Sequence, residues 1–201
     1  MNHRIEKLTR PNLPLAAKAL TNAFFEDPLQ QYVFPDEAER KERSIPHFSA
    51  VLQYGLLFGE VFTANNSEGA VVWLRPGETT VTPDKAEQGG LADLPQTIGE
   101  APFTRFISVL DYADQFHKQD MKEAHWYAMV LGVDPSFQGK GYGSALLAPI
   151  LDEAKTTNIP VYLETAQPKN VSFYKHMGFE LTREVVEPVS GIKIWTFIKR
   201  S

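Results

Sequence analysis

The segment from Val133 to Ser144 holds the residues whose types and spacing point most directly to chemistry. It reads Val-Asp-Pro-Ser-Phe-Gln-Gly-Lys-Gly-Tyr-Gly-Ser, with three glycines at alternate positions. An apolar run typical of a strand precedes it, and an amphipathic pattern typical of a helix follows it. Glycines let backbone N–H groups close around an anion, and a helix N-terminus adds partial positive charge. The pattern therefore predicts a phosphate-binding loop.

Two well-known glycine-rich loops fit this segment poorly. A P-loop requires Gly-Lys followed by Ser or Thr, whereas Gly139-Lys140 is followed by Gly141. A dinucleotide-binding fold places its loop after the first strand of the domain. Here the loop lies about two-thirds of the way along the chain, in the only predicted strand–helix–strand unit. Both observations favour a different kind of phosphate loop.

Composition narrows the classes of function. The chain has 201 residues, with 20 Lys and Arg against 25 Asp and Glu, and a net charge of −5. An acidic chain without a long basic run is poorly suited to a phosphate backbone, so we expect no nucleic-acid partner. The sequence has no cysteine, which excludes thiolate catalysis and Cys-ligated metals. No apolar run approaches the roughly 18 residues of a membrane span, and the first residues lack the apolar core of a secretory signal, so we expect a cytoplasmic protein without a membrane partner.

The elements that must position the loop follow from hydrophobic periodicity and turn residues. A stretch of mixed charges at residues 36–43 is interpreted as the solvated face of a helix. Asn170 is expected to cap a short helix that ends at Gly178. Strands are predicted at residues 5–8, 59–64, 69–74, 124–133, 161–166, 180–187 and 192–199, and helices at about 13–25, 36–58, 141–157 and 170–178, with a helical insertion at about 76–122.

The order of several short motifs resembles the GNAT superfamily of N-acetyltransferases. Gln138-x-x-Gly141-x-Gly143 matches the acetyl-CoA pyrophosphate loop of that superfamily. The strand with Leu-Glu-Thr at 163–165, the segment 170–174 and Gly-Phe at 178–179 follow in the matching order. Within the superfamily, these motifs look closest to puromycin N-acetyltransferase-like proteins. The close similarity covers about residues 124–180.

The resemblance implies an α/β, GNAT-like (acyl-CoA N-acyltransferase) fold in a single domain, residues 1–201. Such a fold has a mixed, strongly bent central sheet of about six to seven strands with helices on both faces. The helical insertion at 76–122 would lie between the third and fourth strands, and residues 124–180 would form the cofactor-binding core. The strand at 124–133 would be central and would diverge from the strand at 161–166 near Gly132.

The resemblance also implies acetyl-CoA as co-substrate and a set of residues that hold it. The strand end would pair with the pantetheine amides, the loop would take the pyrophosphate, and the start of the next helix would bind the pantetheine arm. Lys175 could approach a phosphate, although an exposed helical Lys often serves only solubility. The implied cofactor residues are Leu131, Gly132, Val133, Gln138, Gly139, Lys140, Gly141, Tyr142, Gly143, Ser144, Asn170 and Ser172.

Two residues are candidates for catalysis. Tyr174 matches the position of the general acid in the superfamily, with a core aromatic as the alternative; Phe173 and Met177 could then take the core-facing role. Glu164 alternates with Leu163 along a strand, so the two should face opposite sides of the sheet. A carboxylate there needs a partner or water. It could be a base, an amine-recognition charge or a structural ion-pair partner.

The residues around the acceptor are less well defined by the sequence. Asp27 and Tyr32 follow the first long helix, where the superfamily often builds its acceptor wall, although Asp27 before Pro28 is equally explained as a turn residue. The large aromatic residues Trp73, Trp126 and Tyr127 are expected in the core, and one of them could line the acceptor site. The five histidines show no metal-ligand spacing, so we expect no metal site; only His125 stays a candidate for function.

The sequence therefore predicts an N-acetyltransferase that transfers acetyl from acetyl-CoA to a primary amine of a small molecule. The amine would attack the thioester directly, without a covalent enzyme intermediate. The alternative is a catalytically idle acyl-CoA-binding or regulatory domain with the same fold. The acceptor, the length of the acyl group and the choice between monomer and homodimer stay open at this point.

Overall fold

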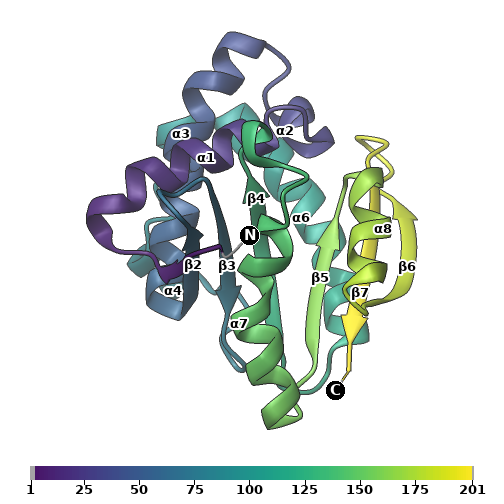
Figure 1. The fold of residues 1–201 in the computed structure, drawn as a ribbon. Coiled ribbons are helices and arrows are strands. Elements are labelled where there is room, and N and C mark those ends of the chain that lie inside the picture. Colours follow the sequence, from purple (N-terminus) through teal and green to yellow (C-terminus); the bar gives the residue numbers. More distant parts are fainter. Residues whose placement is uncertain (1–2, 201) are drawn as a thin grey trace.

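Residues 3–200 are described by the computed structural model, and their seven strands form one sheet in the order β1-β2-β3-β4-β5-β7-β6 (Figure 1). β4 and β5 pair in parallel, and the other neighbours pair antiparallel. The strands are β1 (Ile5–Lys7), β2 (Gly59–Ala64), β3 (Gly69–Leu74), β4 (Trp126–Val133), β5 (Val161–Thr165), β6 (Glu180–Val186) and β7 (Lys193–Lys199). The predicted mixed sheet is confirmed, with seven strands.

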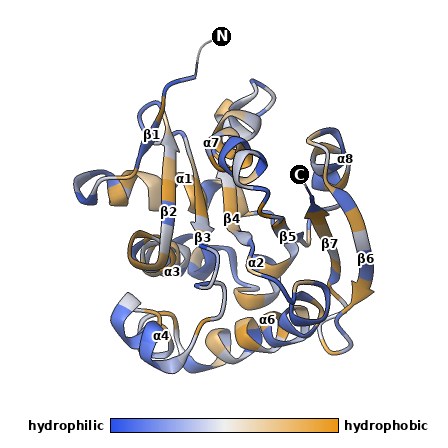
Figure 2. Cartoon of the chain, turned by 90° about the horizontal axis from the view of Figure 1, so that it is seen from below, coloured by the Kyte–Doolittle hydropathy of each residue, from blue (hydrophilic) through white to orange (hydrophobic). Residues whose placement is uncertain are grey.

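Helices cover both faces of this sheet, as the sequence predicts (Figure 2). α7 (Tyr142–Thr157) and α8 (Pro168–His176) lie on one face, and α1 (Leu13–Phe24), α3 (Glu37–Phe58) and α6 (Glu100–Asp120) lie on the other. The remaining helices are α2 (Pro28–Val33), α4 (Pro83–Gly89) and α5 (Leu94–Ile98), with single 3₁₀ turns at Arg10–Asn12 and Pro135–Phe137. Helices α4, α5 and α6 make up the predicted helical insertion between the third and fourth strands.

The sheet separates two hydrophobic cores because apolar side chains alternate between its faces. All six residues of β3 are buried, as in a strand covered on both sides. Val71 and Trp73 pack with the apolar stripe of α7, whereas Ala70 and Val72 pack with α1 and α3. The same alternation fixes which face every β4 and β5 side chain reaches.

β4 and β5 separate after only two paired residues, Trp126 with Val161 and Tyr127 with Tyr162. Beyond them β4 stays paired with β3, and β5 stays paired with β7. The pairing of β3 with β4 shifts between Val72 and Trp73, which leaves Met129 as an extra residue in β4. Such a bulge increases the local twist of a strand. The divergence therefore begins earlier than the predicted point near Gly132.

One local prediction holds only in part, and another is wrong. Residues 36–43 are mostly exposed, as predicted, but Arg40 is only 3% exposed. Its guanidinium donates to the carbonyl oxygen of Phe34 at 2.7 Å and lies over the ring of Phe25. The short helix α8 begins at Pro168 with Gln167 as its N-cap, so Asn170 is not the cap. Proline, which lacks an N–H and has a helical φ, is favoured at the first helical position.

Within residues 3–200, no helix has both the length and the apolar character needed to cross a bilayer.

Candidate active site

The diverging ends of β4 and β5 border a cavity of about 410 Å³, here called the loop cavity. It lies between the 3₁₀ turn with the following glycine-rich segment on one side and the start of α8 on the other. The structure brings most of the predicted cofactor residues together there. The residues that line it are Ala23, Phe24, Asp27, Leu131, Gly132, Val133, Phe137, Gln138, Gly139, Gly141, Tyr142, Gly143, Ser144, Gln167, Lys169, Asn170, Phe173 and Tyr174.

The glycine-rich segment leaves backbone N–H groups free at the start of α7. Gly139 and Gly141 have φ of 74° and 86°, a left-handed conformation that favours glycine. Gly141 is the N-cap, no side chain caps the helix, and its first turn contains no acidic residue. Because the first helical N–H groups have no intrahelical acceptor, they attract an anion. The local geometry therefore agrees with the predicted phosphate loop.

Side chains in this segment brace the loop. The Gln138 amide donates to the carbonyl oxygen of Val133 at 2.9 Å. The Lys140 ammonium donates to the carbonyl oxygen of Ser136 at 3.1 Å and lies over the ring of Phe137, so its charge is folded back onto the loop. Lys140 does not line the loop cavity.

The start of α8 forms the opposite wall. The Asn170 amide donates to the Thr165 hydroxyl at 3.2 Å, which ties α8 to the end of β5. Ser172 is exposed, donates to the carbonyl oxygen of Lys169 and does not line the cavity. Lys169 does line it, and the sequence analysis did not identify it. Its position directly after Pro168 at the helix start is the signal that could have indicated it.

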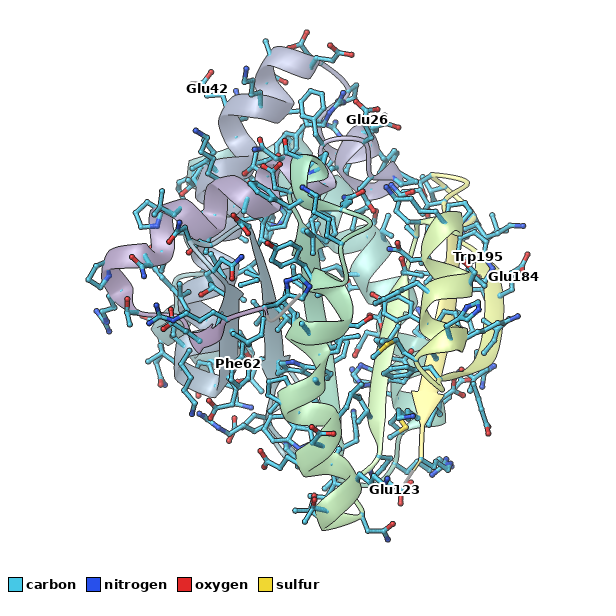
Figure 3. The ribbon with its side chains drawn as sticks, viewed as in Figure 1. Glu26, Glu42, Phe62, Glu123, Glu184 and Trp195 are labelled. Carbon is cyan, nitrogen blue, oxygen red and sulfur yellow. The ribbon has the colours of Figure 1, made fainter. Side chains whose placement is uncertain are left out.

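A hydrogen bond joins α8 to the connection between α1 and α2. The Gln167 amide donates to the carbonyl oxygen of Glu26 at 2.9 Å. Glu26 lies at the end of the molecule where β4 and β5 separate (Figure 3). This contact joins two walls of the loop cavity, because Gln167 lines one wall and Asp27, the residue after Glu26, lines the other.

Gly132 lets α1 approach the end of β4 closely. A Cβ atom at this position would lie within 2.9 Å of side-chain atoms of Leu20, Ala23 and Phe24. A larger residue would therefore push α1 away from the strand. The requirement for glycine here comes from packing, in addition to the predicted contact with the cofactor.

A second cavity, of about 170 Å³ and here called the inner cavity, lies on the α6 side of the sheet. Side chains from α2, α3, α6, β4, β5 and β7 line it. It shares five lining residues with the loop cavity, namely Phe24, Asp27, Leu131, Asn170 and Tyr174. The two cavities therefore meet at these residues, here called the junction.

Tyr174 lies at this junction because it lines both cavities. Its ring packs against Phe179 and Phe197, and the residue is only 5% exposed. The hydroxyl makes no hydrogen bond to any described residue. Burial, helped by the nearby negative charge of Asp27, raises the pKa of Tyr174 well above its ordinary value. The hydroxyl therefore keeps its proton and is available as a donor.

Phe173 and Met177 pack against the α7-side core, as expected, but Tyr174 is itself a buried member of that core. Phe173 is half-buried and also lines the loop cavity. The tyrosine thus combines the two alternatives that the sequence left open. It packs as a core aromatic through its ring and lines both cavities at the junction.

Glu164 faces the inner cavity, on the side of β5 opposite Leu163, which packs in the α7-side core. The Tyr127 hydroxyl donates to Oε1 of Glu164 at 2.7 Å, and Oε2 is buried without a hydrogen bond. Burial raises the pKa of Glu164 to about 7, although the hydroxyls of Tyr127 and Tyr162 act in the opposite direction. Glu164 can therefore exchange a proton near neutral pH.

Asp27 carries both roles that the sequence suggested. Its Oδ1 accepts a hydrogen bond from the Leu29 N–H at 2.9 Å and so caps α2. It also lines both cavities and is only 6% exposed. Burial raises the pKa of Asp27 to about 6, against the lowering effect of backbone N–H groups and of Lys169.

The other aromatic candidates differ in whether they line a cavity or lie in the core. Tyr127 lines the inner cavity, whereas Trp73 and Trp126 lie in the core. Tyr32 lines neither cavity and packs beside Val109.

Among the described histidines, His47 lines a cavity and His125 does not. His125 lines neither cavity, and its Nε2 lies 2.7 Å from Nε2 of His117. The part of the chain that the structure describes contains no cluster of three metal-ligating side chains. His47, which was not among the residues predicted from the sequence, lines the inner cavity. Burial lowers the pKa of His47 to about 4, so its imidazole is neutral at pH 7. Its position within a long amphipathic helix carried no functional signal.

Comparison with known sequences agrees with this geometry. Residues 104–179 match the model of the Acetyltransferase (GNAT) family. An uncharacterized N-acetyltransferase of Schizosaccharomyces pombe is 28% identical over 170 residues, which is 82% of this chain and 69% of that protein. An uncharacterized N-acetyltransferase of Gracilaria tenuistipitata is 40% identical over 47 residues, or 23% of this chain and 26% of that protein.

Solved structures show the same fold. A structure described as histone acetyltransferase HPA2 and related acetyltransferase of Corynebacterium glutamicum has a TM-score of 0.72 and 23% identity, covering 99% of this chain and 96% of that one. The polyamine N-acetyltransferase of Drosophila melanogaster, which forms N-acetylagmatine, has a TM-score of 0.66 and 15% identity, covering 100% of both chains. The architecture is therefore the α/β GNAT fold.

Proposed function

We propose that this chain, which has the GNAT fold and a segment matching the GNAT acetyltransferase family, transfers acetyl from acetyl-CoA to a primary amine of a small molecule. The observation that carries the proposal is the junction. A cavity with free N–H groups and a cavity with carboxylates meet at Tyr174. That is the arrangement needed for an anionic acyl donor on one side and a cationic acceptor on the other.

The residues of the loop cavity suit acetyl-CoA. The uncapped start of α7 offers N–H groups to a pyrophosphate, and the unpaired edge of β4 from Ala128 to Val133 offers backbone groups to the pantetheine amides. Asn170 and Lys169 stand on the opposite wall. When bound there, acetyl-CoA supplies a thioester, which is an acyl group already activated for attack by an amine. Lys140 and Ser172, which lie outside the cavity, stay predictions as cofactor residues.

Glu164 is proposed to accept a proton from the acceptor. A primary amine is mostly protonated at pH 7 and must lose a proton before it can attack. A carboxylate with a pKa near 7 at the wall of this cavity is suited to take that proton, directly or through a water molecule. Tyr127 holds Oε1 of Glu164 in place, which fixes the carboxylate at the wall of the inner cavity.

Tyr174 is proposed to protonate the departing sulfur. The amine nitrogen forms a bond to the acyl carbon, the carbon–sulfur bond breaks, and the electron pair of that bond stays on sulfur. The Tyr174 hydroxyl, protonated and without another hydrogen-bond partner among the described residues, can donate to that sulfur. The second proton, which the nitrogen loses after the bond to carbon has formed, restores the hydroxyl, and the first proton passes from Glu164 to solvent. No nucleophilic side chain is required, and the chain contains no cysteine that could form an acyl thioester.

The experiment that tests this function measures turnover of acetyl-CoA by the full chain with a panel of primary amines. Release of the CoA thiol and the mass of each acylated amine should rise together for at least one acceptor. The panel should include puromycin, because the similarity to puromycin N-acetyltransferase-like proteins stays a prediction. Binding of acetyl-CoA without turnover of any amine would contradict the enzyme and favour the catalytically idle alternative.

A further inference from the structure

The polar and apolar residues of the inner cavity are unevenly distributed. Both carboxylates come from the end near the loop cavity: Asp27 lies at the junction, and Glu164 directly precedes Thr165, which holds Asn170. The distal wall comes from α3, α6 and β7, and its described residues include no carboxylate and no Lys or Arg. They are His47, Phe48, Val51, Phe106, Val109, Leu110, Ala113 and Ile194.

The few polar groups on the distal side already have partners. Gln30 accepts from the Ser44 hydroxyl at 3.1 Å, and its amide nitrogen lies 3.4 Å from Nδ1 of His47. The ring of Phe106 lies edge-on against the imidazole of His47 at 4.6 Å. At neutral pH this end of the cavity is therefore apolar and uncharged.

We infer that the acceptor is a small amine with one ammonium group and an apolar, preferably aromatic, tail; this inference rests on the proposed function. The ammonium group would lie between Asp27 and Glu164, near Tyr174. The tail would extend toward Phe48 and the α6 residues Phe106 and Val109. Helix α6, which belongs to the insertion, then determines acceptor specificity.

Polyamines fit this distribution poorly. A molecule such as agmatine or spermidine would place its second charge against the distal wall, which no described carboxylate lines. Burying an unpaired charge in apolar surroundings is strongly unfavourable. The size of the cavity argues in the same direction. Its 170 Å³ is well below the roughly 300 Å³ at which pockets for drug-sized ligands begin, so a small acceptor fits better than a peptide.

The first test compares kcat/KM for 2-phenylethylamine, agmatine and spermidine, with acetyl-CoA in excess. The inference predicts that 2-phenylethylamine is preferred by about tenfold or more. Preference for agmatine or spermidine would overturn the inference and leave the proposed function intact. Absence of turnover with these amines and with the wider panel would overturn both.

The second test changes the charge of the distal wall with a matched pair of variants. Phe106 is half-buried, so Phe106→Glu and Phe106→Gln should both fold. Each loses the aromatic contact, and kcat/KM for 2-phenylethylamine should fall by about tenfold in both. Only Phe106→Glu should gain activity toward agmatine, because only it supplies a partner for the second charge.

A control keeps this test specific to the acceptor. Phe106 does not line the loop cavity, so the Kd of acetyl-CoA should stay the same in both variants. An unchanged ratio of 2-phenylethylamine to agmatine activity in folded Phe106→Glu would overturn the assignment of α6 as the tail-binding wall.

Discussion

The loop cavity and the inner cavity are built in different ways. The loop cavity owes its character to the backbone of one continuous segment, in which Gly139 and Gly141 take left-handed conformations and the start of α7 stays uncapped. The inner cavity is built by side chains from eight helices and strands, since residues of α1 and α8 join those of α2, α3, α6, β4, β5 and β7. A cofactor shared by many enzymes can be bound by backbone, whereas an acceptor specific to one enzyme is recognised by side chains.

The two cavities also differ in electrostatic character. The described residues of the loop cavity offer unpaired N–H groups and Lys169, which suit phosphate. Glu164 lines only the inner cavity, and Asp27 lines both cavities at the junction; these two carboxylates suit an ammonium group. Only the junction belongs to both. Changes in the loop cavity should therefore alter acetyl-CoA binding, whereas changes to Tyr174 or Glu164 should alter the chemical step and leave that binding nearly unchanged.

The largest effect is expected at the junction. Tyr174→Phe removes the proton donor and keeps the ring that packs on Phe179 and Phe197. We expect kcat to fall by about 100-fold, the lower end for a lost general acid, with the Kd of acetyl-CoA almost unchanged. Steady-state kinetics and calorimetry measure the two quantities. A normal kcat, with chemistry shown to be rate-limiting, would exclude Tyr174 as the acid.

In the inner cavity, Glu164→Gln should lower kcat/KM at pH 7 by at least about tenfold without changing acetyl-CoA affinity. In the wild type, kcat/KM should rise through an inflection near pH 7 as Glu164 ionises, because its pKa is raised to about 7. The variant should lack this inflection. A pH–rate profile for one amine, recorded for both proteins, makes the comparison. Identical pH–rate profiles for the two proteins would show that Glu164 is structural and is not the base.

Glu164→Gln should also change how the stability of the folded protein depends on pH. The pKa of Glu164 is raised above its ordinary 4.5, so burial favours the neutral form. The stability that this group contributes is fully present below about pH 4.5 and is lost as the pH rises through about 7. The Tm of Glu164→Gln relative to the wild type should therefore increase by a few degrees between pH 5 and 8. A constant difference would show that Glu164 is not buried in an apolar environment in solution.

In the loop cavity, Ser144→Asp should weaken acetyl-CoA binding by about fivefold, because it places a negative charge beside the phosphate site. The neutral variant Ser144→Asn is the matched control. An acidic residue in the first turn of α7 favours the helix, so Ser144→Asp should not lower Tm. Calorimetric titration of both variants is the measurement. Equal affinity in both would place the phosphates elsewhere.

The smallest effect is expected for Lys140→Gln. The ammonium group of Lys140 contacts Ser136 and Phe137 on the outside of the loop, so its charge does not face the cavity. The Kd of acetyl-CoA should change by less than about twofold, as for other solvent-exposed charges. A much larger loss would mean that Lys140 turns toward the phosphates when they bind.

The loop cavity owes its character to one continuous segment, and the inner cavity is formed by side chains that are distant in the sequence. This difference explains which parts of the site could be predicted from the sequence. The phosphate loop, the strand before it and α7 could be predicted because glycine spacing and hydrophobic periodicity act within one short segment. Tyr174 and Glu164 could be named because they lie in that same region. Lys140 and Ser172 share the region but lie outside the cavity, because sequence spacing does not show where an exposed side chain turns.

Most residues of the inner cavity could not be predicted from the sequence. His47, Phe106 and Ile194 reach it only through tertiary packing, since they lie on α3, α6 and β7. The bulge at Met129 was missed too, because an unbroken apolar run does not show which residue lacks a partner on the next strand. The burial of Arg40 was also not predicted. Its guanidinium binds the carbonyl oxygen of Phe34, which lies before the helix begins, and helical periodicity does not show such a contact.

A crystal structure of the full chain with CoA would show directly whether Tyr174 stands between the two substrates. We expect the pyrophosphate at the start of α7, the pantetheine arm along the free edge of β4, and the sulfur within hydrogen-bonding distance of the Tyr174 hydroxyl. The inner cavity should stay open on the other side of that sulfur. A complex in which the sulfur lies away from the junction, or in which the pantetheine arm fills the inner cavity, would contradict the account.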